Sequence, residues 1–475
     1  MKLNPYPEYK DSGVPWLGKI PKHWEVRRLK FLCHNLNEQI SEKQPGETYI
    51  ALEHVESWTG RISLPDGEIT FDSQVKRFQP GDVLFGKLRP YLAKVTQPQF
   101  AGVCVGEFLV LRATENVSAD FLEQKLRSKR TIDLINSSTF GTKMPRANWT
   151  FIGNLKLAYP SAEEQRAISR FLKNKTSQIN KFIRNKRRLI ELLKEQKQNI
   201  INQVVTGKCE VRRMKDENGK ERLKAFPTSP LKLRPSNVEW LGDIPKHWEV
   251  RRIKFLFAER EERKGDMEFE LLSFSRSKGL VPFFEISSKP PSAEDLSKYK
   301  VCRPGHLLMN RMQAWSGMFT DVVIEGIVSP DYSVFEPIRP MSVAYFSYLF
   351  KTKHHINEFT MASKGIGDGF NRLYTPAFGA IRTLCPPVDE QNEIVEFIKQ
   401  ETEIIDAAIS RAEREIELMR EYRARLISDV VTGQVDVRGI EVPEVAEDEL
   451  SALEEDDAVT DEMMDNEEAM DDEND

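Results

Sequence analysis

The sequence predicts an α+β protein built from two related domains in tandem, each followed by one long helix. The first observation is a nineteen-residue phrase that occurs twice, at residues 14–32 and 238–256, with only three differences. The second is that each copy precedes short β-like runs and then a long apolar-periodic stretch without Pro or Gly. The offset of 224 residues is nearly half of the 475-residue chain. We therefore expect the function to need two copies of one unit.

The repeat extends beyond this phrase. Later anchors pair residues 78–84 with 302–308, 159–165 with 385–391, and 204–207 with 430–433. The offset slips only from 224 to 226, so both halves are expected to share one fold while the intervening stretches have diverged.

The charge is distributed unevenly along the chain. The net charge is −5, but residues 439–475 contain 18 acidic residues and no Lys or Arg. Residues 1–438 then carry 69 basic and 56 acidic residues, a net of +13. A basic body favours a polyanionic partner, nucleic acid before membrane.

Two domains are expected because the chain is too long for one hydrophobic core. We assign the first to residues 1–160 and the second to residues 238–386. Short β-like runs such as 103–111 and 332–335, separated by Gly, Pro and Asp, indicate a compact α+β domain in each half.

A long helix is expected after each domain, over residues 161–210 and 387–438. Matching apolar positions with steps of mostly three, four and seven residues predict a heptad-like seam. The seam residues are Ile168, Leu172, Ile179, Ile183, Ile190 and Leu193 in the first helix, and Ile394, Ile398, Ile405, Ile409, Ile416 and Met419 in the second. Each helix would be roughly 65 Å long, which is longer than the diameter of a domain of this size. The two helices are therefore expected to pack on each other rather than each on its own domain.

Two further segments are expected to lack a core. Residues 211–237 are polar, charged and interrupted by Pro, which is typical of a linker. Residues 439–475 are acidic and poor in aromatic residues, which predicts a disordered tail.

The sequence offers no catalytic residue and no metal site. The five cysteines form no CxxC pair, which indicates reduced thiols in a cytoplasmic protein. No signal peptide or membrane-spanning stretch is visible. Residues 329–332 (SPDY) bear only a faint likeness to a methyltransferase motif, and no glycine-rich cofactor turn accompanies them.

Basic residues interleaved with aromatic and amide residues are candidates for DNA contact, because they can bind phosphates or base edges. In the first half these are Lys87, Arg89, Tyr91, Lys94, Lys143, Arg146 and Asn148; in the second they are Arg276, Lys278, Arg311, Gln313, Trp315, Lys364, Asn371 and Arg372. A solvated loop is the alternative for any single residue, but the clusters as a whole favour DNA.

The repeated phrase at 16–24 and 240–248, the Glu-Gln pairs at the helix starts and the Val-Val-Thr-Gly helix ends resemble those of type I restriction–modification specificity subunits. The resemblance covers residues 1–438. It implies two target recognition domains and two long helices packed as an antiparallel coiled coil. Each domain would read one half of a bipartite, asymmetric DNA site, and the helices would set the gap.

The same resemblance implies partners and cofactors. Two modification subunits would supply S-adenosylmethionine chemistry, and restriction subunits would supply ATP-driven translocation and cleavage with Mg²⁺. This chain would bind no cofactor itself. Two other functions remain open: a self-contained DNA methyltransferase or nuclease, and a coiled-coil scaffold that never touches DNA.

Overall fold

The fold is described from a computed structural model of the chain. It describes residues 3–40, 44, 46–64, 74–141, 144–215, 219–275, 279–287, 291, 295–365 and 371–443. The chain divides into two compact units. Of the described residues, unit 1 contains those of Met1–Arg188 and those that follow from Ala412 to residue 443, and unit 2 contains those of Leu189–Arg411.

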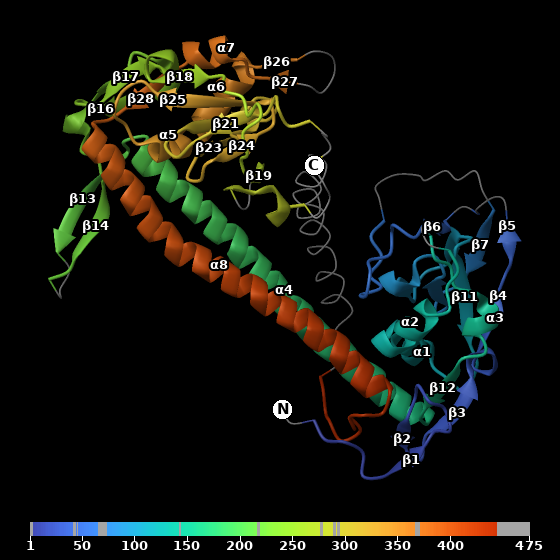
Figure 1. Ribbon diagram of the computed structural model, residues 1–475. Coiled ribbons are helices and arrows are strands. Elements are labelled where there is room, and N and C mark those ends of the chain that lie inside the picture. The colour runs from blue at the N-terminus through green and yellow to red at the C-terminus, as the bar shows by residue number, and fades with distance from the viewer. Residues whose placement is uncertain are drawn as a thin grey trace. The chain divides into compact units, whose positions relative to one another are not determined.

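The domain of unit 1 is a mixture of short strands and helices (Figure 1). Its strands are β1 (Tyr9–Asp11), β2 (Lys19–Pro21), β3 (Glu25–Arg28), β4 (Cys33–Leu36), β5 (Gln39–Ile40), β6 (Thr48–Ile50), β7 (Val75–Phe78), β8 (Val83–Gly86), β9 (Val95–Thr96), β10 (Gly102–Val105), β11 (Phe108–Ala113) and β12 (Lys156–Tyr159). Its helices are α1 (Ala119–Arg127), α2 (Lys129–Asn136) and α3 (Trp149–Ile152), with 3₁₀ turns η1 (Leu29–Phe31) and η2 (Pro90–Leu92).

The domain of unit 2 is likewise a mixture of short strands and helices. Its strands are β13 (Cys209–Lys215), β14 (Glu221–Pro227), β15 (Leu233–Pro235), β16 (Asp243–Pro245), β17 (Glu249–Arg252), β18 (Phe257–Arg260), β19 (Leu272–Ser275), β20 (Gly279–Pro282), β21 (Lys300–Cys302), β22 (Leu307–Asn310), β23 (Phe319–Asp321), β24 (Gly326–Val328), β25 (Tyr332–Pro337), β26 (Lys364–Gly365), β27 (Asn371–Arg372) and β28 (Arg382–Cys385). Its helices are α5 (Val343–Phe350), α6 (Lys353–Ala362) and α7 (Thr375–Ala380), and its 3₁₀ turns are η3 (Pro230–Lys232), η4 (Glu239–Leu241), η5 (Ile253–Phe255), η6 (Phe283–Glu285) and η7 (Ala314–Ser316).

The two domains contain the same central sheet. Its strand order is β4-β11-β8-β9 in unit 1 and β18-β25-β22-β23 in unit 2. The register also repeats, because Ala113 pairs with Cys33 and Pro337 pairs with Phe257, each residue displaced by 224. Consecutive residues of the central strands, such as Val110 and Leu111 or Val334 and Phe335, are buried, so both faces of each sheet are covered. The predicted α+β class and shared fold are confirmed.

Each domain is followed by one helix of 44 residues, α4 (Ala162–Val205) and α8 (Val388–Val431), as predicted. Gly207 and Gly433 follow the helix ends with φ of 74° and 77°. Glycine adopts this left-handed conformation without a Cβ clash, which is why both helices end there.

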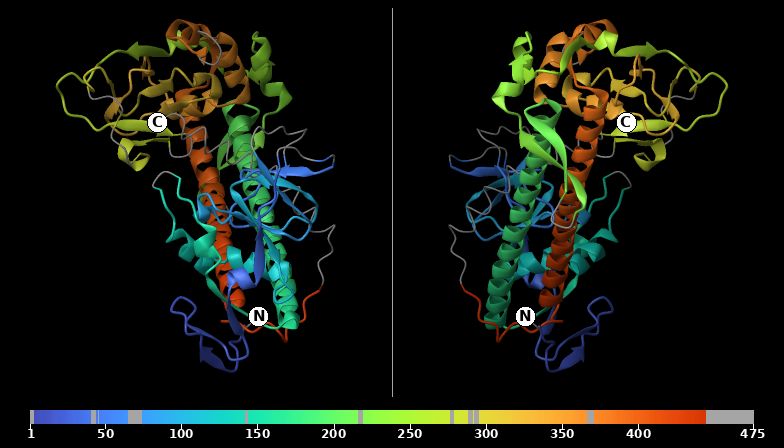
Figure 2. Two further views of the ribbon diagram at one scale, coloured as in Figure 1. Left: turned by 90° about the vertical axis from the view of Figure 1, so that its right-hand side faces the viewer. Right: turned by 90° about the vertical axis from the view of Figure 1, so that its left-hand side faces the viewer.

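The two helices run antiparallel. In unit 1, Lys186 of α4 forms an ion pair with Glu415 of α8 at 2.7 Å. In unit 2, Lys197 lies further along α4, and its partner Asp406, at 2.6 Å, lies earlier on α8. Within each unit the two helix segments lie side by side (Figure 2). Of the twelve seam residues, nine are buried, and Leu193, Ile409 and Met419 are half-buried.

Each repeated phrase is attached to the helix that follows its domain. His23 Nε2 lies 2.7 Å from Glu164 Oε2, and His247 Nε2 lies 2.7 Å from Glu390 Oε2. Both carboxylates lie in the first turn of their helix, where the positive end of the helix dipole favours negative charge. The adjacent Trp24 is fully buried beside this pair.

The same phrase also packs on the end of the other helix. A Cβ at Gly433 would lie 2.4 Å from Pro21 Cδ, and one at Gly207 would lie 2.6 Å from Pro245 Cδ. Neither position therefore has room for a side chain. Each phrase thus joins the start of one long helix to the end of the other.

The segment 211–237, expected to be a linker, contains regular structure. β13 and β14 form an antiparallel hairpin with seven residue pairs, from Cys209↔Pro227 to Lys215↔Glu221. Val211 and Leu223 are buried among Arg and Lys residues on the two strands. The strands were not predicted because their sequences are mostly polar, and only one residue in each strand is buried in the core. Of the expected disordered tail, residues 444–475 lie outside the described residues.

Candidate nucleic-acid interface

The DNA-contact candidates of each domain come from two stretches far apart in the sequence, and one backbone hydrogen bond brings them together. In unit 1 the Ala147 N–H donates to the Lys87 carbonyl at 2.8 Å. In unit 2 the Leu373 N–H donates to the Arg311 carbonyl at 3.0 Å. These residues correspond in the repeat, so both domains place the candidates at the same point of the fold.

In unit 1 the first stretch turns sharply. Arg89 and Ala93, on either side of η2, have left-handed backbones with φ of 49° and 50°. The Arg89 N–H donates to the Pro145 carbonyl at 2.8 Å, which holds this conformation against its steric cost. Non-glycine residues in this region occur often at functional sites. The turn leaves Arg89 and Tyr91 exposed.

The second stretch of unit 1 places Arg146 beside this turn. Arg146 forms backbone bridges with Leu88 and Phe140, and its guanidinium lies 3.0 Å from Glu107. This ion pair is at the surface, so it is weak and can be exchanged for a phosphate at little cost. The Phe140 side chain is 79% exposed. Arg89, Tyr91, Arg146 and Phe140 form what we call cluster 1.

Other candidates of unit 1 have structural roles. Lys94 Nζ donates to the Leu52 carbonyl at 2.7 Å, and burial lowers its pKa. Asn148 caps α3, since its Oδ1 accepts from the Thr150 N–H at 2.9 Å. Lys87 is half-buried, and Lys143 lies outside the described residues.

In unit 2, η7 stands where η2 stands in unit 1, displaced by 224 residues. Trp315, at the position of Tyr91, is 39% exposed, and its Nε1 donates to the Met312 carbonyl at 2.8 Å. Gln313, at the position of Arg89, is half-buried. The Arg311 guanidinium donates to the carbonyls of Pro330 (2.6 Å) and Asp331 (3.0 Å). Arg311 thus holds the turn before β25.

The remaining candidates of unit 2 lie on a short hairpin. β26 and β27 pair Lys364 with Arg372 and Gly365 with Asn371. Lys364 and Asn371 are exposed. Arg372 Nη2 lies 3.6 Å from Asp331 Oδ1, which keeps it beside η7. We call Gln313, Trp315, Lys364, Asn371 and Arg372 cluster 2. Arg276 and Lys278 lie outside the described residues.

Comparison with known proteins agrees with this arrangement. The chain is 25% identical over 173 residues to the Escherichia coli type I restriction enzyme EcoDI specificity subunit, covering 35% of this chain and 37% of the relative. It is 24% identical over 232 residues to the Methanocaldococcus jannaschii MjaVIII specificity subunit, covering 44% and 51%. This chain resembles the specificity subunits of type I restriction enzymes.

A likeness of fold extends over more of the chain. A solved chain from work on complex assembly and conformational transition of the type I R–M system superimposes with a TM-score of 0.64. It covers 88% of this chain and 99% of its own length at 17% identity. The alignments with the two specificity subunits span about a third and a half of those relatives' lengths. No protein-family model matches the chain.

Four exposed apolar side chains that belong to the two clusters, or lie near them in the sequence, were not predicted from the sequence. Phe140 and Met144 in unit 1, and Met361 and Tyr374 in unit 2, are all exposed. Their position in the sequence could have indicated them, because Phe140 and Met144 flank basic residues that were selected as DNA-contact candidates. Apolar side chains can contact the thymine methyl group in the major groove of DNA.

The described residues contain no group of three His, Cys, Asp or Glu that could hold a metal ion. None of the helices in this part of the chain is long and apolar enough to cross a bilayer. Cys33, Cys104, Cys302 and Cys385 are free and buried, and burial raises the pKa of the Cys33 and Cys104 thiols to about 12. Such thiols are poor nucleophiles.

Proposed function

We propose that this chain is the non-catalytic specificity subunit of a type I restriction–modification enzyme. Domain 1 (residues 1–160) reads one half of a bipartite, asymmetric double-stranded DNA site with cluster 1. Domain 2 (residues 238–386) reads the other half with cluster 2. One observation carries the proposal. The hydrogen bonds Ala147–Lys87 and Leu373–Arg311 are equivalent, but the side chains around them differ.

The long helices α4 and α8 set the gap between the half-sites and hold the partner subunits, which are two modification subunits and the restriction subunits. Exposed apolar side chains on the two helices, outside the seam, support the role of holding partner subunits, because exposed apolar patches mark protein interfaces. These exposed residues are Phe182, Leu189, Leu192, Ile404, Leu418 and Tyr422.

The partners supply the chemistry. S-adenosylmethionine binds the modification subunits, and ATP and Mg²⁺ serve the restriction subunits. This chain works in the cytoplasm and contributes recognition, through phosphate contacts that position it and base contacts that specify the sequence.

The test is a domain exchange within the reconstituted methyltransferase. Residues 14–160 are replaced by the corresponding domain of another specificity subunit, and methylated sites are mapped by sequencing. The recognised sequence should change in one half-site only. A change in both half-sites would overturn independent reading by the two domains.

Two further outcomes separate the alternatives. Methyl transfer to DNA by the purified chain alone would make it a self-contained enzyme. DNA binding that is absent with the modification subunit present, or that is insensitive to salt, would make it a scaffold. Each phosphate contact should contribute about −0.9 to the slope of log affinity against log salt.

A further inference from the structure

We call the contact between a repeated phrase and the start of its helix the joint; it is formed by His23 and Glu164 in unit 1 and by His247 and Glu390 in unit 2. The side chains that surround the joint differ between the two units. In unit 1, Tyr6 is buried in this joint, and its hydroxyl donates to Glu164 Oε1 at 2.6 Å. The tyrosine ring lies edge-on to Trp24, with centroids 6.1 Å apart, and 5.7 Å from the His23 ring. Trp24 Nε1 donates to the same carboxylate oxygen at 3.0 Å. Glu164 therefore accepts from three side chains.

In unit 2 the residue at the position of Tyr6 is Pro230, which has no hydroxyl and no aromatic ring. Glu390 keeps its contact with His247, but its side chain is 22% exposed, compared with 4% for Glu164. Trp248 Nε1 is buried and has no hydrogen-bond partner among the described residues. An indole N–H left in this state destabilises the fold by about 1–3 kcal/mol.

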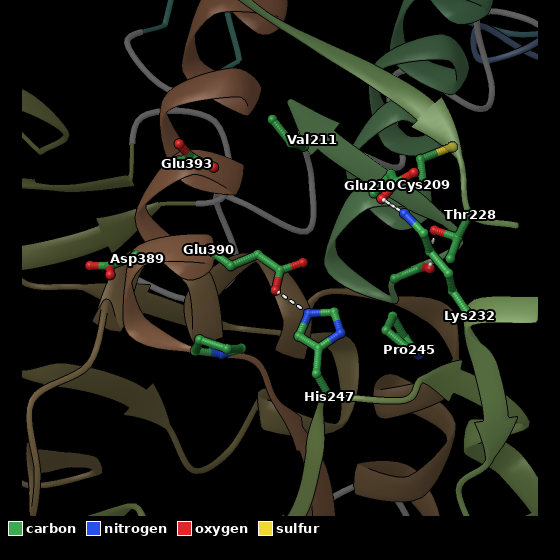
Figure 3. A pocket seen from close by; sticks show the side chains of 12 residues that line it. Cys209, Glu210, Val211, Thr228, Lys232, Pro245, His247, Asp389, Glu390 and Glu393 are labelled. Atoms are coloured by element: carbon green, nitrogen blue, oxygen red, sulfur yellow. Dashed lines mark hydrogen bonds and ion pairs between the residues drawn. The ribbon is translucent and has the colours of Figure 1, made fainter. Parts of the chain in front are cut away.

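A cavity of about 330 Å³ opens at this place in unit 2. Figure 3 shows His247 and Glu390 joined on one side of it and Lys232 with Glu210 on the other. His247 and Glu390 are the counterparts of the two residues that hold Tyr6 in unit 1. The cavity also lies beside Pro245, the counterpart of Pro21. Unit 2 thus keeps the histidine, the glutamate and the proline of the tyrosine site in the cavity wall, without the tyrosine. Trp248 lies behind this wall, next to the lining residue Gly207.

We propose that this cavity binds the side chain of a tyrosine from a second polypeptide chain. The phenol hydroxyl donates to the Glu390 carboxylate, as Tyr6 does to Glu164. The carboxylate then turns far enough to accept from Trp248 Nε1 as well. The ring packs against the edge of Trp248 and beside the His247 imidazole.

The surroundings define the partner further. Asp389, Glu393 and Glu210 line the cavity with Glu390, so basic residues beside the tyrosine are favoured over acidic ones. All eleven tyrosines of the chain lie among the described residues, and none of them lines the cavity. The tyrosine therefore comes from another chain, and the proposal does not depend on DNA binding.

The test uses the full chain with ¹⁵N-labelled tryptophan and three probes: acetyl-Lys-Tyr-amide, acetyl-Lys-Phe-amide and p-cresol. The readout is the indole N–H resonance of Trp248, assigned with Trp248→Phe. We expect the tyrosine peptide to shift this resonance downfield. The phenylalanine peptide should bind about tenfold more weakly, because it lacks the charge-assisted hydrogen bond. If p-cresol binds and the tyrosine peptide does not, the site takes only free phenols, and a partner chain is excluded.

Two substitutions supply matched controls. Pro230→Tyr fills the cavity from within and should abolish the response of Trp248. Tyr6→Ala opens the equivalent space in unit 1 and should make the Trp24 resonance respond as well. Glu390→Gln keeps the shape of the site and should weaken binding of the tyrosine peptide about tenfold. This variant tests the proposal even if Pro230→Tyr does not fold. An unshifted Trp248 resonance at saturating tyrosine peptide, or a full response in Glu390→Gln, would overturn the proposal.

Discussion

The ammonium of Lys125 lies 2.6 Å from the carbonyl oxygen of Val431, at the end of α8. The last carbonyls of a helix lack intrahelical partners, and the negative end of the helix dipole attracts a cation. Lys125 is fully buried and lies 5.7 Å from the centre of the Trp24 ring. Burial, and then the charge of Arg130, lower the pKa of Lys125 to about 7. In unit 2 the neutral Tyr345 hydroxyl serves the equivalent carbonyl, that of Val205, at 2.8 Å.

This difference predicts a pH-dependent stability for unit 1. The pKa of Lys125 is 10.5 in the unfolded chain and about 7 in the folded chain, so the unfolded state binds more protons between these values. The unfolding free energy should therefore rise with pH above 7, by up to about 1.4 kcal/mol per pH unit. Urea unfolding at pH 7, 8 and 9 measures it. The advantage of wild type over Lys125→Met should grow with pH, whereas Tyr345→Phe should show a constant difference from wild type.

The two helix-start carboxylates should contribute unequally to stability. Glu164→Ala leaves the buried Tyr6 hydroxyl and Trp24 Nε1 without an acceptor, whereas Glu390→Ala removes only the contact with His247. We expect Glu164→Ala to lower the unfolding free energy by about 1–3 kcal/mol more than Glu390→Ala does. Equal losses in urea unfolding would contradict the assignment of three donors to Glu164.

Cluster 1 should affect one half-site of the DNA. Arg89→Ala or Arg146→Ala should weaken DNA binding by the reconstituted methyltransferase by about 1–3 kcal/mol, because a phosphate or base contact is lost. Fluorescence anisotropy with half-site variants of the DNA measures the effect. Lys156→Ala, an exposed lysine on β12 outside the cluster, is the control and should bind as wild type does. Relaxed specificity in the other half-site would contradict the assignment of cluster 1.

The antiparallel helices predict an adjustable gap. A heptad inserted into both helices, near Lys186 of α4 and Ala412 of α8, lengthens the pair by roughly 10 Å, about three base pairs of DNA. Methylation mapping should show a spacer longer by that amount. An insertion in α4 alone displaces Lys186 from Glu415 and should abolish methylation. An unchanged spacer after the double insertion would show that the helices do not set the gap.

Most of the fold was predictable because the duplication supplies an internal comparison. Residues 33–36 and 257–260 form corresponding strands, and the Pro/Gly-free stretches became α4 and α8. The β13–β14 hairpin was missed because it buries little apolar surface. The sequence from residue 215 to residue 222 is also rich in charge.

The candidate site was less predictable, because the role of a basic residue depends on its neighbours in space. Lys94 and Arg311 stand, like Arg89, in stretches that mix basic and aromatic residues, yet they bind backbone carbonyls inside their own domain. No local pattern distinguishes a guanidinium that holds a turn from one that meets solvent. Likewise, the cavity lined by His247 and Glu390 lies where Pro230 replaces Tyr6, and a sequence comparison shows this only once the contacts of Tyr6 are known.

The repeated phrase has a genetic consequence. Sixteen of its nineteen residues are the same in both copies, and each copy joins a helix start to a helix end. A crossover inside this phrase, between the genes of two related chains, would therefore exchange the sequence that follows the phrase. The contacts of the phrase with the helix start and the helix end would be restored. The contacts at the helix ends would be inherited unchanged from either parent, and only the side chains outside the repeated phrase would be new. Selection can thus act on recognition through crossover, without waiting for the scaffold to accumulate compensating mutations.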